Sequence, residues 1–226
     1  MAPENTIAAF EQAIAEGADG IELDLHLSRD DQLVVIHDAS LGRTTNGSGA
    51  VRDRTLRELK RLDAGGWRGH KFEGQRIQTL QEVLERFRER TRFWIELKAG
   101  SDRYPGIEER LVSAIEIYDV LDRALVQSFD PSVLEQIRSL NREVRVGVLA
   151  EQRPLQPIIR SVVPPYALCP SIDAITNGDI AEIRRAGLDC YVWTVNEPAQ
   201  MDRLIHSPVS GIITDRPELL RGRLDR

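Results

Sequence analysis

The chain has 226 residues, of which 41% are hydrophobic and 29% are charged, and its formal net charge is −6. This composition supports a sizeable buried core and excludes a disordered or fibrous chain. An acidic chain without a basic run is poorly suited to bind nucleic acid or an anionic membrane surface. No apolar stretch approaches the ~18 residues that a membrane-spanning helix needs. The two cysteines, Cys169 and Cys190, imply no disulfide framework. We therefore expect a cytoplasmic protein with no membrane span and no nucleic-acid partner.

The sequence begins with a predicted helix over residues 6–16, which ends at Gly17. Apolar, strand-like runs then alternate with helical segments along most of the chain. Strands are predicted at residues 21–25, 93–97, 124–128, 144–149, 166–170, 190–195 and 211–214. Helices are predicted at residues 80–90, 107–118, 132–140, 179–186 and 199–205. This alternation indicates right-handed crossovers and a parallel sheet.

The strand count favours one particular α/β fold. A closed (β/α)8 TIM barrel has eight parallel strands, and seven are predicted here. Because the chain opens with a helix, we expect the missing element to be the first strand of the barrel. An open, doubly wound sheet is the alternative, but no predicted strand is followed by the glycine-rich loop typical of a nucleotide site.

Charged side chains occupy one face of two predicted strands. Side chains alternate along a strand, so Glu22 and Asp24 share one face of the first strand while its other face is apolar. Glu96 and Lys98 share one face of the second strand in the same way. In a barrel the apolar faces pack beneath the helices, so we expect these four side chains to point into the barrel mouth.

A further extended run, residues 33–37, follows the first strand too closely for a parallel crossover. We therefore predict an antiparallel hairpin. With a two-residue turn at Asp30 and Asp31, Asp24 would lie opposite His37. This register would bring His37 beside the carboxylates, whereas a slip of one residue would turn it to the other face.

Several carboxylates close together in a barrel mouth are costly unless they are paired or bind a metal. Oxygen ligands from Glu22, Asp24 and Glu96 suit a hard cation, Mg²⁺ or Ca²⁺. Such an ion could hold a phosphate with help from Lys98, and His37 would then be placed for proton transfer. Taken singly, these residues are typical of a solvated strand face, an ion pair or a capped loop. Their shared position on polar strand faces favours a site.

Sequence blocks along nearly the whole chain carry a family resemblance. The chain resembles the glycerophosphodiester phosphodiesterases of the phospholipase-C-like phosphodiesterase superfamily. Each block is weakly specific by itself, but their common order is highly specific. The blocks are Pro-Glu-Asn-Thr at residues 3–6, and then residues 17–24, 34–38, 41–47, 95–98, 127–130, 192–196 and 211–217.

The resemblance implies a fold and an activity. It implies one TIM-barrel domain over residues 1–226, with a small inserted subdomain at about residues 38–78. It also implies a phosphoric diester hydrolase that releases glycerol 3-phosphate and an alcohol from deacylated phospholipids. The partner is then a small-molecule glycerophosphodiester.

The resemblance also assigns roles to matching residues. It implies that Glu22, Asp24 and Glu96 hold one divalent cation, Mg²⁺ or Ca²⁺. His37 would be one of two acid–base histidines, and Lys98 would contact the phosphate.

Two aromatic residues are implied near the glycerol group, Phe129 and Trp193. Core packing at a strand end is the alternative interpretation of both residues.

The chain departs from the family pattern at one place. Family members carry His-Arg-Gly on the first barrel strand, shortly before the Pro-Glu-Asn-Thr block, which here starts at Pro3. His26 is a poorly placed substitute, one strand pair further from the carboxylates. We therefore expect weak or no activity, and two exposed strand edges that promote self-association.

The departure leaves two alternatives open. One is a non-catalytic or truncated family member that binds a metal or glycerophosphodiesters. The other is a related phosphodiesterase that acts on another headgroup or on a lysophospholipid.

Overall fold

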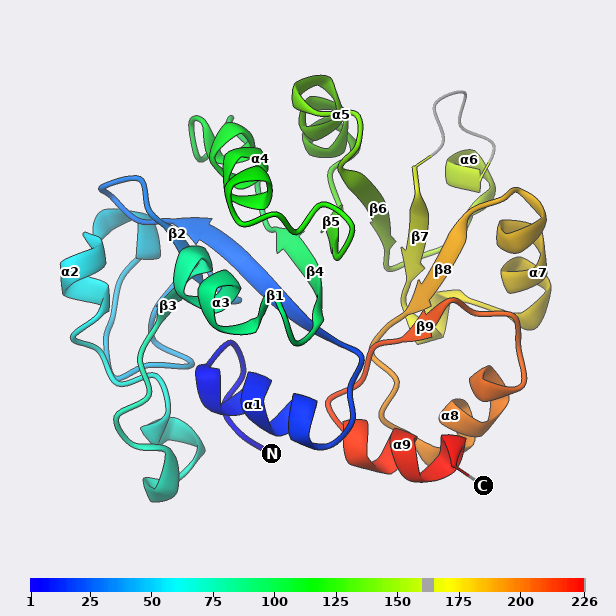
Figure 1. Cartoon of the computed structure of the whole chain (residues 1–226), viewed down its shortest axis with the longest axis horizontal. Coiled ribbons are helices and arrows are strands. Elements are labelled where there is room, and N and C mark those ends of the chain that lie inside the picture. Colours follow the sequence, from blue (N-terminus) through cyan, green and yellow to red (C-terminus); the bar gives the residue numbers. More distant parts are fainter. Residues whose placement is uncertain (160–164, 226) are drawn as a thin grey trace.

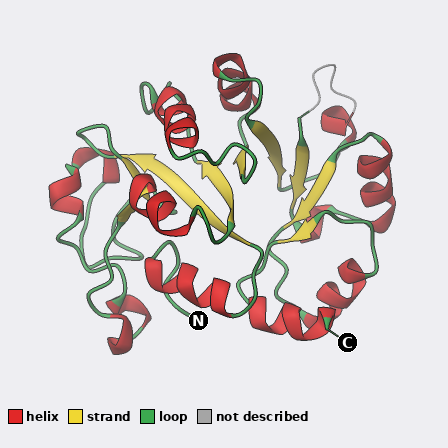
Figure 2. Cartoon of the chain, in the orientation of Figure 1, coloured by secondary structure: helices red, strands yellow, loops and turns green. Residues whose placement is uncertain are grey.

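The computed structural model describes residues 1–159 and 165–225. Its centre is a sheet of parallel strands surrounded by helices (Figures 1 and 2). The parallel strands are β1 (Gly20–Leu27), β4 (Arg92–Leu97), β5 (Ala124–Ser128), β6 (Arg145–Ala150), β7 (Ala167–Pro170), β8 (Asp189–Val192) and β9 (Gly211–Ile212). Each pairs in parallel with the next in this order. The predicted strands and their common direction are confirmed.

The predicted helices are also present, with ends that differ by a few residues. They are α1 (Ile7–Ala15), α3 (Leu80–Phe87), α4 (Ile107–Ile117), α5 (Pro131–Leu140), α7 (Asn177–Arg185) and α8 (Pro198–Ile205). Three further helices were not predicted, α2 (Leu56–Leu59), α6 (Gln156–Ile159) and α9 (Pro217–Leu224). Single turns of 3₁₀ helix cover Val51–Asp53, Gly66–Arg68, His70–Phe72 and Ile172–Ala174. None of the helices within residues 1–159 and 165–225 combines the length and the apolar composition that spanning a membrane requires.

Local hydrogen bonds explain where several helices begin. At α3 the Thr79 hydroxyl accepts a hydrogen bond from the Glu82 backbone N–H at 3.1 Å, and the Glu82 carboxylate accepts one from the Thr79 N–H at 2.8 Å. This reciprocal pair satisfies two backbone donors that would otherwise lack partners. The same arrangement starts α2 and α7.

Alternation along the strands separates two apolar layers. On β1, Leu23 and Leu25 are fully buried in the large core that also contains α3, α4 and α5. The opposite face of the sheet encloses a smaller cluster inside the barrel. This inner cluster consists of Leu125, Leu149, Ala167 and Cys169, with Trp94, Tyr191 and Trp193 packed against it.

The hairpin is present, but its predicted register was wrong by one residue. β2 (Leu33–Val35) pairs antiparallel with β1, and Leu25 lies opposite Val35. The turn has three residues rather than two, because Asp31 takes a left-handed conformation with φ of 59°. A three-residue turn of this kind shifts all cross-strand partners by one. Ile36, whose N–H donates to the Asp24 carbonyl at 3.0 Å, therefore takes the place beside Asp24, and His37 follows it beyond the end of β2.

The hairpin also carries a second, smaller core. β2 pairs on its outer edge with β3 (Gln78–Thr79), a short strand that was not predicted. The residues of this core come from β2 and from the segment between β2 and β3, and they are Val34, Ile36, Leu41, Val51, Leu59, Ala64 and Ile77. The domain boundaries and the insertion at residues 38–78 stay a prediction.

The sheet is open between its first and last parallel strands. The strand order is β3-β2-β1-β4-β5-β6-β7-β8-β9, so within the described residues β1 and β9 are not paired with each other. The hairpin covers only the C-terminal part of the free β1 edge, at Leu25–Leu27. Figure 1 shows α1 and α9 along the same side of the molecule, below this seam. The expected gap between the two edge strands is confirmed.

Candidate active site

Three carboxylates converge at the C-terminal side of the sheet. Glu22 and Asp24 come from the inner face of β1, and Glu96 comes from the neighbouring strand β4, directly beside Asp24. One carboxylate oxygen from each residue lies within 4.8 Å of the others. Because β1 and β4 are parallel and in register, the alternation of side chains is sufficient to bring the three together.

Lys98 partly neutralises this cluster. Its Nζ lies 2.8 Å from Asp24 Oδ1 and 2.9 Å from Glu96 Oε1, and all three side chains are largely buried. Burial alone would lower the pKa of Lys98, but the charges of Asp24 and Glu96 raise it above its usual value. Lys98 is therefore a fixed cation at the centre of the site.

The remaining carboxylate, Glu22, has a weaker partner. Gln127 Nε2 donates a hydrogen bond to Glu22 Oε1 at 3.2 Å. Burial, together with the charges of Asp24 and Glu96, raises the pKa of Glu22 well above its usual value. Burial also raises the pKa of Glu96, against the opposing charge of Lys98. Without a further cation, the cluster therefore favours uptake of a proton.

The cluster fits a hard divalent cation. Its donors are carboxylate oxygens, which Mg²⁺ and Ca²⁺ prefer. Gln127 Oε1, next to Glu22, is buried and has no hydrogen-bond partner among the described residues. A bound cation would offer a partner to the unpaired Gln127 oxygen and would balance the excess negative charge of the carboxylates.

Asn5 holds Asp24 in place, a contact that the sequence analysis did not predict. Asn5 Nδ2 donates to Asp24 Oδ2 at 2.7 Å, and the Asp24 backbone N–H donates to Asn5 Oδ1 at 3.2 Å. Asn5 has a φ of 56°, a left-handed conformation that asparagine tolerates well. The only sequence signal for this role was its place in the Pro-Glu-Asn-Thr block.

His37 lies at the rim of the site, with its side chain 51% exposed. It is near enough to Glu96 for its charge to lower the pKa of that carboxyl group. Its Nδ1 lies 2.8 Å from Asp38 Oδ1, a carboxylate that can only accept a hydrogen bond. Nδ1 is therefore the donor in this pair, and the Asp38 contact leaves Nε2 free.

Asp38 is itself held by a chain of charged groups. Arg43 donates to both Asp38 oxygens, at 2.7 and 2.9 Å, and to both Glu4 oxygens, at 2.9 and 2.6 Å. The hydrogen bonds from Arg43 hold the pKa of Asp38 well below its usual range. The network joins residues far apart in the sequence and fixes the orientation of the His37 ring.

We expect Arg43→Gln to destabilise the protein more at neutral pH than at about pH 3. Because the pKa of Asp38 is depressed in the folded state, its contribution to stability is complete above the unfolded pKa of about 3.9 and decreases as the pH falls below it. Urea unfolding at both pH values measures this difference. Arg57→Gln, at an exposed position in the same segment, is the control. Equal destabilisation by Arg43→Gln at both pH values would contradict the prediction.

His26 is not available as a substitute acid or base. Its ring is buried, its Nε2 lies 3.0 Å from the His37 carbonyl oxygen, and its Nδ1 lies 2.7 Å from the Tyr104 hydroxyl. The carbonyl requires a proton on Nε2, so Nδ1 accepts from Tyr104. Burial also lowers the pKa of His26. His26 therefore supports the hairpin, and both of its ring nitrogens are already in use.

The two aromatic candidates lie together above the inner cluster. The Phe129 and Trp193 rings are 5.8 Å apart in an edge-to-face arrangement. Trp193 Nε1 donates to the Cys169 carbonyl oxygen at 2.7 Å, whereas Phe129 follows β5 and is 48% exposed. Trp193 is thus anchored in the barrel, and Phe129 leaves an apolar surface open at the rim.

Comparison with known proteins decides the family. The sequence model of the glycerophosphoryl diester phosphodiesterase family matches residues 1–219. The chain belongs to this family. The resemblance found in the sequence is thereby confirmed, and the enzyme class is that of the phosphoric diester hydrolases.

Individual relatives agree with this assignment. The chain is 42% identical over 220 residues to a glycerophosphodiester phosphodiesterase of Caldanaerobacter subterraneus subsp. tengcongensis, a match that covers 96% of the chain and 90% of the relative. A crystal structure of a glycerophosphodiester phosphodiesterase from Agrobacterium tumefaciens is 31% identical, with a TM-score of 0.85 over 98% of the chain and 94% of that structure. An Oleispira antarctica phosphodiesterase, solved with the product sn-glycerol-3-phosphate, is 27% identical, with a TM-score of 0.85 over 100% of the chain and 92% of that structure. The TIM-barrel fold class is confirmed.

Proposed function

We propose that the chain hydrolyses glycerophosphodiesters to glycerol 3-phosphate and an alcohol, with one divalent cation, Mg²⁺ or Ca²⁺, as cofactor. The observation that carries this proposal is the convergence of three carboxylates and Lys98 at the mouth of the barrel. The product bound in the Oleispira relative supports the choice of substrate class.

Glu22, Asp24 and Glu96 are the residues that would hold the cation. When bound, it would supply positive charge that stabilises the phosphate oxygens during hydrolysis. Lys98 would hold a non-bridging phosphate oxygen by its ammonium group. Because this ammonium is already fixed between two carboxylates, little reorganisation is needed when the phosphate binds.

His37 would transfer a proton through Nε2. Asp38 accepts the hydrogen bond from Nδ1, which keeps one tautomer and one ring orientation when the imidazole is neutral. Phe129 and Trp193 would form the apolar wall against the glycerol group. Their edge-to-face contact supports this role by fixing the angle between the rings.

Cleavage of a phosphodiester requires both a base and an acid. His37 can take one of these roles, but His26 has no free ring nitrogen for the other. We therefore propose that the chain as given has reduced activity. A non-catalytic relative that binds a metal or the diester is the second candidate, favoured by the same shortage of a second histidine. No observation favours a different headgroup or a lysophospholipid.

We further propose that residues 1–226 form one phosphodiesterase domain with an insertion at residues 38–78. We also propose that the protein associates with itself through the unpaired edges of β1 and β9, and that it is cytoplasmic. Two free, buried thiols, at Cys169 and Cys190, are compatible with a reducing compartment. Self-association is supported by the unpaired strand edges.

The decisive experiment compares hydrolysis of glycerophosphocholine by two proteins, this chain and one extended at its N-terminus by a strand ending in His-Arg-Gly. Both are assayed with Mg²⁺, with Ca²⁺ and with a chelator. We expect metal-dependent release of glycerol 3-phosphate, on the order of 10²–10⁴-fold faster for the extended protein. If neither protein hydrolyses the diester but both bind the metal, the second candidate is correct.

A further inference from the structure

Two buried polar side chains connect the rim of the site to a loop that takes no part in the proposed chemistry. His26, on β1, and Tyr104, in the loop between β4 and α4, are each 2% exposed. Their rings meet edge to face, with centroids 5.5 Å apart. Burial of polar side chains is costly unless each finds a hydrogen-bond partner. Both find one, and the chain of partners ends at the backbone of His37.

The hydrogen bonds of this pair run in one direction. His26 Nε2 donates to the His37 carbonyl oxygen at 3.0 Å, because a carbonyl can only accept. Nδ1 of the neutral ring is then an acceptor, and the Tyr104 hydroxyl, 2.7 Å away, donates to it. A ring held at both nitrogens cannot turn without breaking a buried hydrogen bond. The Tyr104 hydroxyl therefore fixes the ring that holds the His37 carbonyl.

The His37 backbone is supported by this ring at the point where strand pairing ends. The last cross-strand pair of the hairpin is Leu25 with Val35, and the Ile36 N–H still donates to the Asp24 carbonyl at 3.0 Å. Beyond that bond, the His37 carbonyl is held by the His26 side chain rather than by a neighbouring strand. His26 thus extends the support of the strand to the residue that carries the proposed proton-transfer group.

The loop that carries Tyr104 is closed on itself and fastened to α4. Glu108, in the first turn of α4, is 1% exposed, and its carboxylate accepts from the Ser101 N–H at 3.0 Å and from the Ser101 hydroxyl. The Ser101 hydroxyl also accepts from the Gly106 N–H at 3.2 Å. The Tyr104 N–H donates to the Gly100 carbonyl at 2.9 Å. The Tyr104 hydroxyl is therefore presented from a loop that buried hydrogen bonds hold in shape.

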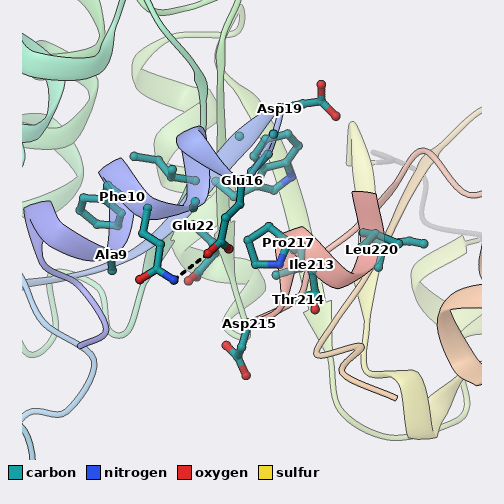
Figure 3. Close-up of a pocket in the computed structure, with 18 of the residues that line it drawn as sticks. Ala9, Phe10, Glu16, Asp19, Glu22, Ile213, Thr214, Asp215, Pro217 and Leu220 are labelled. Carbon is teal, nitrogen blue, oxygen red and sulfur yellow. Dashed lines mark hydrogen bonds between the residues drawn. The ribbon is translucent and has the colours of Figure 1, made fainter. Parts of the chain in front are cut away.

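The pair is separate from the seam between β1 and β9. A cavity of about 790 Å³ lies at the seam, and Figure 3 shows Glu22 there between side chains of α1 and α9. Neither His26 nor Tyr104 lines this cavity. The contacts of the pair lie toward the hairpin and the loop before α4, so they do not depend on what occupies the seam.

We propose that Tyr104 is a positioning residue that acts through the His26 ring and sets the place of His37 relative to Lys98. The proposal rests on the proposed function, in which His37 transfers a proton and Lys98 holds the phosphate. Lys98 keeps its two carboxylate partners without Tyr104. The His37 carbonyl, in contrast, loses a fixed donor once the His26 ring can turn. A displacement of about 1 Å at a reacting group can lower a rate about 10²-fold.

The test is Tyr104→Phe, which removes only the hydroxyl group. With glycerophosphocholine and Mg²⁺, we expect kcat to fall at least about tenfold. KM should change less than about twofold, because the groups that hold the phosphate stay in place. The carbonyl ¹³C resonance of His37 should also move, since its hydrogen bond from His26 weakens. This resonance is measured without substrate and does not depend on catalysis.

Tyr118→Phe is the matched control. It removes the same group from a hydrogen bond, 3.0 Å long, to Glu85 at the other end of α4. This variant should leave kcat, KM and the His37 carbonyl resonance unchanged. An equal fall of kcat in Tyr104→Phe and Tyr118→Phe would show a general loss of stability and would overturn the proposal.

Two variants of His26 examine the route. His26→Gln keeps an N–H donor for the His37 carbonyl and an oxygen that can accept from Tyr104, so it should retain most of kcat. His26→Leu can do neither and should lose about as much as Tyr104→Phe. In the His26→Leu background, Tyr104→Phe should cause no further loss, because both act on one contact. If His26→Leu does not fold, His26→Gln and Tyr104→Phe still test the route.

An unmoved His37 carbonyl resonance in Tyr104→Phe would overturn the proposal whatever the rate. A moved resonance with an unchanged kcat would also overturn it, because Tyr104 would then support the hairpin without affecting catalysis. If the unmodified chain hydrolyses no diester, the proposed function fails. The His37 carbonyl resonance then decides by itself whether Tyr104 positions His37.

Discussion

Addition of Mg²⁺ or Ca²⁺ is expected to raise the unfolding temperature of the chain, and Asp24→Asn should abolish that increase. A ligand at about 100 times its dissociation constant stabilises the folded state by about 2.7 kcal/mol. For a chain of this size, that corresponds to a shift of roughly 5–10 °C. Asp24 is central because one of its carboxylate oxygens lies within 4.8 Å of an oxygen of Glu22 and of Glu96, and because Asn5 orients it.

Thermal unfolding with metal and with chelator measures this effect. The control is Asp19→Asn, which removes an exposed carboxylate just before β1 and leaves the cluster unchanged. This variant should respond to the metal as the unmodified chain does. The prediction fails if the unmodified chain shows no response, or if the two variants lose it equally.

His37→Ala is expected to lower kcat/KM for glycerophosphocholine by about 10²–10⁴-fold, the usual cost of losing one acid–base group. The metal-induced rise in unfolding temperature should persist, because His37 is outside the carboxylate cluster. The variant is best made in the protein extended at its N-terminus by a strand ending in His-Arg-Gly. The higher rate expected for that protein makes a large loss of kcat/KM measurable.

The control for this second prediction is His206→Ala, at an exposed position after α8. It should leave both the rate and the metal response unchanged. A His37→Ala variant that hydrolyses the diester at the original rate would show that another group transfers the proton.

Some features of the site could be predicted because they depend on local alternation. Side chains two residues apart on a strand share a face, so Glu22 and Asp24 had to lie together once β1 was recognised. Glu96 and Lys98 follow the same rule on β4, and parallel pairing then places Glu96 beside Asp24. No long-range information beyond the order of the strands was required.

Other features could not be predicted because the backbone conformation of a single residue changes the positions of residues elsewhere in the structure. The left-handed conformation of Asp31 adds one residue to the turn, so that Ile36 rather than His37 lies beside Asp24. The sequence offered no strong preference between the two turn lengths, since aspartate is tolerated in both. An error of one residue in the length of the turn was sufficient to assign the wrong residue opposite Asp24.

The sequence by itself determined the parallel α/β architecture, the family and the carboxylate cluster, because each depends on patterns that repeat along the chain or on ordered motifs. Only the tertiary structure decided which side chains support the cluster. Asn5 reaches Asp24, Gln127 reaches Glu22, and Arg43 joins Asp38 to Glu4. Contacts of this kind form where separate elements pack together, and no spacing along the sequence records the distance between them.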